Sequence, residues 1–152
     1  TGSNEVGLDF SQFAFAIRNP KPVSKYWEKL GFPAMEVTPG TSWGKEYYGE
    51  PADFEMNLGW QRHGNIVYEW CIPLRGPTVY HDHIEKYDEG IQHFGFGVSD
   101  MDEAIAFFES KGYRISMSGG WGDKGKPGSG RFAYVDTEQI GGETIELLWS
   151  YK

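Results

Sequence analysis

The sequence contains an internal repeat. Residues 12–32 align without a gap on residues 93–113, and the residue class agrees at nearly every position. The identical pairs are Phe13/Phe94, Phe15/Phe96, Glu28/Glu109 and Gly31/Gly112. Such a repeat restricts the chain to folds in which two copies of one supersecondary unit pack together.

Each copy predicts a strand followed by a helix. Residues 12–17 alternate between bulky and small or polar side chains, the period that a strand requires. Asn19 and Asp100 stand where helix N-caps are expected, before residues with apolar side chains at helical spacing. Gly31 and Gly112 then stand where a glycine ends a helix.

The rest of each copy predicts strands. We expect them near residues 33–38, 45–49, 53–61 and 65–73 in the first copy, and near 114–118, 131–136 and 143–149 in the second, with a short connecting helix at 81–87. The predicted fold is therefore α+β, with two tandem βαβββ modules in one compact domain. The first module spans 9–73, a linker 74–92 and the second module 93–150.

The two faces of the first strand in each copy differ in the same way. One face carries bulky residues, which suit packing under a helix. The other carries one polar residue and two very small ones, namely Gln12, Ala14 and Ala16 in the first copy and His93, Gly95 and Gly97 in the second. We interpret the small residues as the border of a concave face that leaves room for a ligand.

Charge and composition exclude several classes of protein. The formal charge of −8 disfavours nucleic acid and anionic membrane surfaces as partners. The sequence has no apolar segment long enough to cross a membrane and no secretory signal, so we expect a cytoplasmic location. The single cysteine, Cys71, excludes a disulfide scaffold, and its apolar neighbours indicate a buried small side chain.

The sequence resembles the vicinal oxygen chelate superfamily, which includes glyoxalase I, methylmalonyl-CoA epimerase, extradiol dioxygenases and bleomycin-resistance proteins. The resemblance covers most of residues 9–150 and is strongest in GPTVYHDHIEKYDEGIQHFGFGVSDMDEAIAFFESKGY and GSGRFAYVDTEQIGGETIELLW, which are similar to the epimerase branch. Residues 33–62 match that branch poorly. The resemblance implies a curved mixed sheet around a metal-containing cleft.

The resemblance also implies a set of metal ligands. By motif position these are Gln12, Glu69, His93 and Glu146. All four residue types can bind a metal, and two carboxylates would neutralise a divalent ion. We expect one divalent ion, with Zn, Ni, Co, Mn and Mg left open.

The activity implied is that of a metal-dependent isomerase, epimerase or lyase acting through an enolate. Its substrate would be a small carbonyl compound or acyl thioester. Glu69 or Glu146 is the expected proton carrier if a ligand serves as the base, and Glu36 or Glu46 if a non-ligand carboxylate does. The ligand set looks more like glyoxalase I, whereas the second module looks more like the epimerase.

Expected substrate contacts are Ala14, Gly95, Gly97 and Trp121. The glycine-rich segment 117–130 predicts a mobile hairpin loop that carries Trp121, and Trp43, Tyr48 and Trp60 are candidates to enclose a flat substrate. A homodimer is possible. The alternatives are an extradiol-type dioxygenase, disfavoured because Gln12 replaces a histidine, and a metal-free small-molecule binding or resistance protein.

Overall fold

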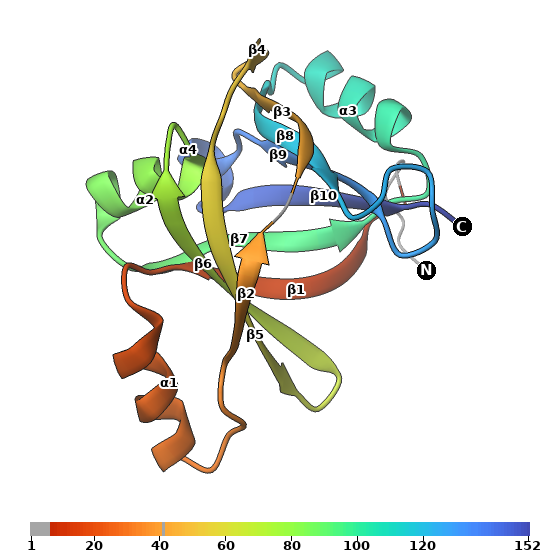
Figure 1. The fold of residues 1–152 in the computed structure, drawn as a ribbon. Coiled ribbons are helices and arrows are strands. Elements are labelled where there is room, and N and C mark those ends of the chain that lie inside the picture. The colour runs from red at the N-terminus through yellow and green to blue at the C-terminus, as the bar shows by residue number, and fades with distance from the viewer. Residues whose placement is uncertain (1–6, 41) are drawn as a thin grey trace.

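The computed structural model describes residues 7–40 and 42–152, and in this part of the chain the strands form one curled mixed sheet (Figure 1). The strands are β1 Asp9–Ala16, β2 Glu36–Gly40, β3 Trp43–Tyr47, β4 Glu50–Pro51, β5 Glu55–His63, β6 Ile66–Arg75, β7 Gly90–Gly97, β8 Ile115–Trp121, β9 Gly130–Val135 and β10 Thr144–Ser150. The helices are α1 Pro20–Lys29, α2 Val79–Tyr87, α3 Met101–Ser110 and α4 Glu138–Gly141.

The sheet repeats one pairing pattern in its two halves. The order is β2-β5-β6-β1-β7-β10-β9-β8-β3-β4. β1 lies parallel to β6, β7 lies parallel to β10, and β1 and β7 join the halves as an antiparallel pair. This arrangement confirms the α+β class expected from the repeat and the curved mixed sheet implied by the family resemblance.

Residues 33–62, which match the epimerase branch poorly, include a strand pairing that the repeat does not predict. β2 pairs with β5 at one edge of the sheet, whereas β3 pairs with β8 at the other. β2 ends at Gly40 and β3 begins at Trp43, so the chain passes from one edge to the other within a few residues (Figure 1). The hairpin of β3 and β4 thus extends the second half of the sheet rather than the first.

The helix ends follow the predicted signals. The side chain of Asn19 accepts a hydrogen bond from the backbone N–H of Lys21, and that of Asp100 accepts one from Glu103. Gly31 and Gly112 have φ angles of +89° and +92°, a conformation that glycine adopts without strain. The repeated cap signals therefore set equivalent bounds for α1 and α3.

The glycine-rich segment is partly strand rather than loop. β8 continues to Trp121, and only residues 122–129 connect it to β9. A Cβ on Gly120 would lie 2.3 Å from the indole of Trp43, and one on Gly119 would lie 3.1 Å from the ring of Phe132. These glycines allow close side-chain approach within a strand, which explains why the segment looks like a loop in the sequence.

The convex face of the sheet carries α1 and α3. Trp70 packs with Val23 and Trp27 of α1, and Trp149 packs against the cluster that contains Met101, Ala104 and Phe108 of α3. Between the helices, Phe13 and Phe94 meet edge to face at 5.3 Å and stay half-exposed. The bulky face is therefore only partly covered by helices.

One end of the concave side is filled by a hydrophobic cluster. It comprises Ala16, Phe54, Met56, Cys71, Val79, Tyr80, Met117 and Tyr134. α2 supplies two of these side chains and closes this end of the curled sheet, which leaves the remaining interior for a cavity. None of the helices in residues 7–40 and 42–152 has the length and apolar character needed to cross a membrane.

Candidate functional site

The concave face encloses a cavity of about 540 Å³. Because successive strand residues point to opposite faces, alternate residues of β9 and β10 line it while their neighbours pack in the cluster that contains α3. The principal lining residues are Gln12, Met56, Leu58, Trp60, Glu69, Tyr80, Trp121, Phe132, Tyr134, Glu146 and Leu148. The walls are mostly apolar, and acidic side chains lie at the deep end.

The structure brings together the four residues that the sequence suggests as ligands. His93 Nε2 lies 3.1 Å from Glu146 Oε1 and 3.4 Å from Glu69 Oε1. Gln12 Nε2 donates a hydrogen bond of 3.1 Å to the same Glu146 oxygen. All four residues are buried, with at most 6% of the residue surface exposed.

Two small residues allow this cluster to form. Ala14 lies in register between Glu69 on β6 and His93 on β7, and Gly95 lies between Gln12 on β1 and Glu146 on β10. A Cβ on Gly95 would lie 2.6 Å from Cγ of Gln12. Small side chains at these positions let the larger polar ones meet above them.

The tautomer of His93 follows from its neighbour Gln92. His93 Nδ1 lies 2.5 Å from Gln92 Oε1, and because an amide oxygen only accepts, Nδ1 must donate. In neutral His93 the lone pair of Nε2 would then face two carboxylate oxygens, and this nitrogen has no regular hydrogen-bond partner. The arrangement therefore requires a positive charge between these groups, either a proton or a metal ion.

The charge balance of the cluster shifts several pKa values. Burial alone would lower the pKa of His93, but Glu146 and Glu69 outweigh this effect and raise it to about 9. Burial raises the pKa of Glu146, with the charge of His93 opposing the rise. Burial also raises the pKa of Tyr80 and Tyr134, so both hydroxyl groups stay protonated.

The pKa of His93 predicts how the stability of the metal-free protein depends on pH. Its folded-state pKa of about 9 lies above the ordinary value of 6.5, so its contribution is complete below pH 6.5 and is lost as the pH rises toward 9. The free energy of unfolding should fall by about 1.4 kcal/mol per pH unit within this window. Urea unfolding of chelator-treated wild type and His93→Gln measures this difference, and parallel pH profiles for the two proteins would contradict it.

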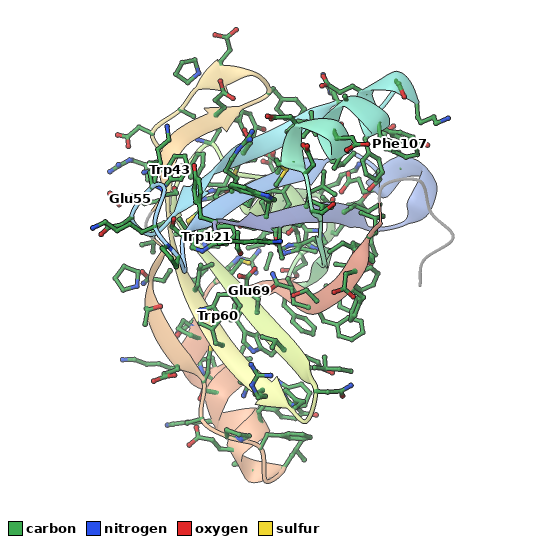
Figure 2. The ribbon with its side chains drawn as sticks, turned by 90° about the vertical axis from the view of Figure 1, so that its right-hand side faces the viewer. Trp43, Glu55, Trp60, Glu69, Phe107 and Trp121 are labelled. Atoms are coloured by element: carbon green, nitrogen blue, oxygen red, sulfur yellow. The ribbon has the colours of Figure 1, made fainter. Side chains whose placement is uncertain are left out.

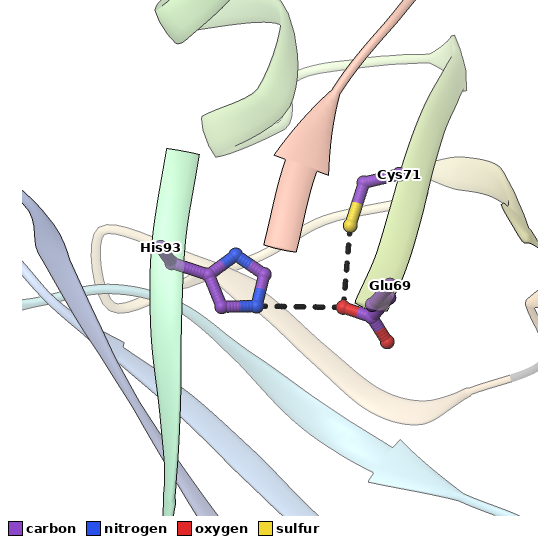
Figure 3. A group of neighbouring side chains, drawn as sticks. All are labelled: Glu69, Cys71 and His93. Atoms are coloured by element: carbon purple, nitrogen blue, oxygen red, sulfur yellow. Dashed lines mark hydrogen bonds and ion pairs between the residues drawn. The ribbon is translucent and has the colours of Figure 1, made fainter. Parts of the chain in front are cut away.

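Cys71 is a potential donor that the sequence analysis did not identify. Its thiol donates a hydrogen bond of 3.3 Å to Glu69 Oε1, and Glu69, Cys71 and His93 each offer a ligand atom within 4.8 Å of the others (Figure 3). Burial raises the pKa of the thiol, and the charges of Glu69 and Glu146 add to the rise. The signal available in the sequence is its position two residues after Glu69, which places both side chains on one face of β6.

The other expected substrate contacts separate into two groups. Gly97, Trp121 and Trp60 line the cavity, and Figure 2 shows Trp121 and Trp60 on either side of Glu69. Ala14 is fully buried, Gly95 lies beneath the side chain of Gln12, and neither lines the cavity. The alternation along the strands therefore identified the face that points toward the cavity. The small size of Ala14 and Gly95, however, makes room for the polar cluster rather than for a ligand.

The remaining aromatic candidates lie outside the cavity wall. Trp43 covers Gly120, and its indole N–H donates a hydrogen bond to the carbonyl of Gly122. Tyr48 has a φ angle of +48° and lies against the guanidinium group of Arg114. Both belong to the β3–β4 hairpin, whose pairing with β8 the repeat did not predict.

The two candidate non-ligand bases do not line the cavity. Glu36 lies on edge strand β2 and is exposed. Glu46 lies on β3 and borders a separate hollow with Arg114 and Ser118. Of the carboxylates that the structure describes, those on the cavity wall are Glu69 and Glu146.

The model of the Glyoxalase/Bleomycin resistance protein/Dioxygenase superfamily matches residues 11–134. Comparison with curated protein sequences gives no significant match.

Solved structures of similar fold include methylmalonyl-CoA epimerase from Mycobacterium tuberculosis, with a TM-score of 0.61, 18% identity and coverage of 100% of this chain and 93% of that chain. A hypothetical protein from Bacillus halodurans C-125 has a TM-score of 0.62, 18% identity and coverage of 96% of both chains. A variant of Streptomyces coelicolor methylmalonyl-CoA epimerase, in complex with 2-nitronate-propionyl-CoA, has a TM-score of 0.59, 17% identity and coverage of 96% of this chain and 100% of that chain. The repeated strand pairing, the curled sheet and the family match lead to one assignment: the chain belongs to the glyoxalase/bleomycin resistance protein/dioxygenase superfamily.

Proposed function

We propose that this protein is a metal-dependent isomerase, epimerase or lyase that moves a proton next to a carbonyl group of a small carbonyl or acyl-thioester substrate. The observation that carries the proposal is the buried cluster of Gln12, Glu69, His93 and Glu146 at the deep end of an otherwise mostly apolar cavity. Two carboxylates beside one imidazole give a site that can balance a divalent charge.

The cluster fits a divalent ion in its donor chemistry. The hydrogen bond from His93 Nδ1 to Gln92 leaves Nε2 free to bind a metal, an arrangement common among metal-binding histidines. Glu69 and Glu146 place carboxylate oxygens beside Nε2. The Gln12 amide, whose nitrogen donates to Glu146, would supply its oxygen to an ion after turning about its terminal bond. One imidazole with mostly oxygen ligands is compatible with Zn, Ni, Co, Mn or Mg.

The residues of the site have distinct roles in this proposal. The divalent ion supplies a Lewis acid that stabilises negative charge on a substrate oxygen. Glu146 is held by both Gln12 and His93 at 3.1 Å, whereas Glu69 has a longer contact of 3.4 Å with His93 and a weak thiol hydrogen bond. Glu69 is therefore the freer carboxylate and the better candidate to remove and return the proton.

The fold neighbours support a small acyl thioester as one possible substrate, because Streptomyces coelicolor methylmalonyl-CoA epimerase has been solved with 2-nitronate-propionyl-CoA. The number of histidines in the cluster favours this chemistry over that of an extradiol dioxygenase. The iron site of such a dioxygenase needs two histidines and one carboxylate, whereas the described cluster offers His93 with two carboxylates.

Solvent exchange tests the proposed activity. The protein is loaded with a divalent ion and incubated in deuterated water with an α-substituted acyl thioester or a hemithioacetal of a 2-oxoaldehyde. Proton NMR should show deuterium entering the carbon next to the carbonyl, and chelation should stop it. Absence of exchange with both substrates, together with oxygen consumption on a catechol, would support the dioxygenase instead.

A further prediction follows from Gly95, which leaves space for the Gln12 side chain. In Gly95→Ala the new methyl group collides with the Gln12 side chain and displaces it from Glu146, so we expect metal affinity to fall by about tenfold. Gly97→Ala is the matched control, because its Cβ would meet nothing closer than 3.7 Å. Metal titration followed by calorimetry measures both variants, and equal affinities would contradict this role.

A further inference from the structure

We propose that the cavity selects a compact, apolar acyl or carbonyl group with a flat or aromatic part, and that it gains no affinity from a nucleotide carrier such as coenzyme A. This inference rests on the proposed function, because it names the substrate class of the same site. The juxtaposition that supports it is a set of aromatic side chains beside the polar cluster, with no Lys or Arg among the described residues that line the cavity.

Among the described residues, the cavity wall offers none of the side chains that usually bind phosphate. In residues 7–40 and 42–152, Glu69 and Glu146 are the charged side chains on the cavity wall, and no Lys, Arg or His side chain lines it. Phosphate groups are usually bound by arginine, lysine or helix N-termini. The net charge of −8 adds a repulsive long-range field for a ligand that carries several phosphates.

Three cationic side chains on segments that border the cavity do not line it. Lys124 Nζ lies 4.9 Å from the ring centroid of Trp43, and Lys126 pairs with Asp123 at 3.5 Å. Arg62 lies two residues beyond Trp60 on the same face of β5, but it is exposed and does not line the cavity. Arg62 and Lys124 are therefore the residues whose removal should reveal any phosphate recognition.

The apolar part of the cavity favours a flat group. Trp60 on β5 is paired in register with Glu69 on β6, whereas Trp121 on β8 and Phe132 on β9 line the cavity from the other half of the sheet. Figure 2 shows Trp60 and Trp121 on either side of Glu69. The Trp121 indole N–H donates a hydrogen bond of 3.1 Å to the carbonyl of Gly128. A Cβ on Gly130 would lie 2.6 Å from the Trp121 ring, so this glycine leaves the ring its place.

A ring held in this way loses little conformational freedom when a ligand binds. Aromatic groups gain affinity from offset or edge-to-face contacts with such rings, beyond the area that they bury. A cavity of about 540 Å³ accommodates a compact organic group and not an entire nucleotide thioester. The acyl part, rather than the carrier, should therefore determine affinity.

Matched thioesters test the exclusion of the carrier. Phenylacetyl-coenzyme A and phenylacetyl-N-acetylcysteamine present the same acyl group, and only the first carries phosphates. We expect their Kd values, measured by calorimetry on the metal-loaded protein, to agree within about threefold. Arg62→Ala and Lys124→Ala should leave both values unchanged.

A preference above tenfold for the coenzyme A ester, reduced by Arg62→Ala or Lys124→Ala, would overturn the inference. Deuterium exchange on the same thioesters separates the two proposals. Equal binding without exchange would contradict the proposed function alone. Exchange with a strong preference for the coenzyme A ester would contradict the substrate class alone. If neither ester binds, the proposed substrate class is contradicted.

Substitution of Trp60 tests the aromatic wall. Trp60→Leu should weaken phenylacetyl-N-acetylcysteamine by about tenfold and propionyl-N-acetylcysteamine by less than about threefold, because only the phenyl group gains from a ring contact. Trp60→Phe keeps a ring and should retain most of the affinity, and thermal unfolding checks that both variants fold. Equal losses for the two thioesters, or no loss for either, would contradict the flat-group preference.

Discussion

His93→Ala is expected to reduce divalent metal affinity by more than about 100-fold, beyond the loss typical of residues that only orient a ligand. His93 supplies the nitrogen donor of the cluster and is fully buried, so no other side chain replaces it without rearrangement. Metal titration of chelator-treated protein measures the change.

Two further variants show whether this loss is specific. Gln92→Leu removes only the acceptor of the His93 Nδ1 proton, and we expect an intermediate loss of about 10- to 100-fold. His83→Ala, on α2 and outside the cluster, should bind the ion as wild type does. Retained metal binding in His93→Ala, or its loss in His83→Ala, would mean that the ion binds elsewhere.

Glu69→Gln is expected to slow α-proton exchange by at least about 100-fold, the usual contribution of a general base. Because Glu69 has the looser contacts in the cluster, this variant should retain more metal affinity than Glu146→Gln. Glu146→Gln should lose both metal affinity and exchange, since Gln12 and His93 both depend on its carboxylate. Exchange measured at saturating metal separates the two effects.

The comparison between these two variants is informative because both substitutions preserve side-chain shape. If Glu69→Gln retains the wild-type exchange rate at saturating metal, Glu69 is not the proton carrier. If Glu146→Gln binds metal as well as wild type does, Glu146 is not a ligand, and the assignment within the cluster must change.

Much of the fold follows from local signals that occur twice. Asn19 with Gly31, and Asp100 with Gly112, mark the ends of equivalent helices, and those signals act over a few residues. The structure then pairs the equivalent strands β1 and β7 at the centre of the sheet. Family resemblance then indicated which four polar side chains to examine, and the structure places them in contact.

The features that sequence did not predict depend on contacts between distant segments. The pairing of β3 with β8 requires the chain to cross from one sheet edge to the other, and no local pattern specifies an edge. In the sequence Gly120 resembles a loop residue, but in the structure it lies on β8 and leaves space for the indole of Trp43. Likewise, Gly95 looks like part of a ligand pocket, although Gln12 occupies the space that it leaves.

The most direct test of the account is to measure metal content and proton exchange on one sample of wild-type protein. Elemental analysis should give about one divalent ion per chain after loading, the ratio expected for a single four-ligand site. Deuterium incorporation into an α-substituted acyl thioester should disappear when that ion is chelated and return when it is restored. Exchange at the same rate in fully metal-free protein would contradict the account, as would failure of the wild type to retain any divalent ion.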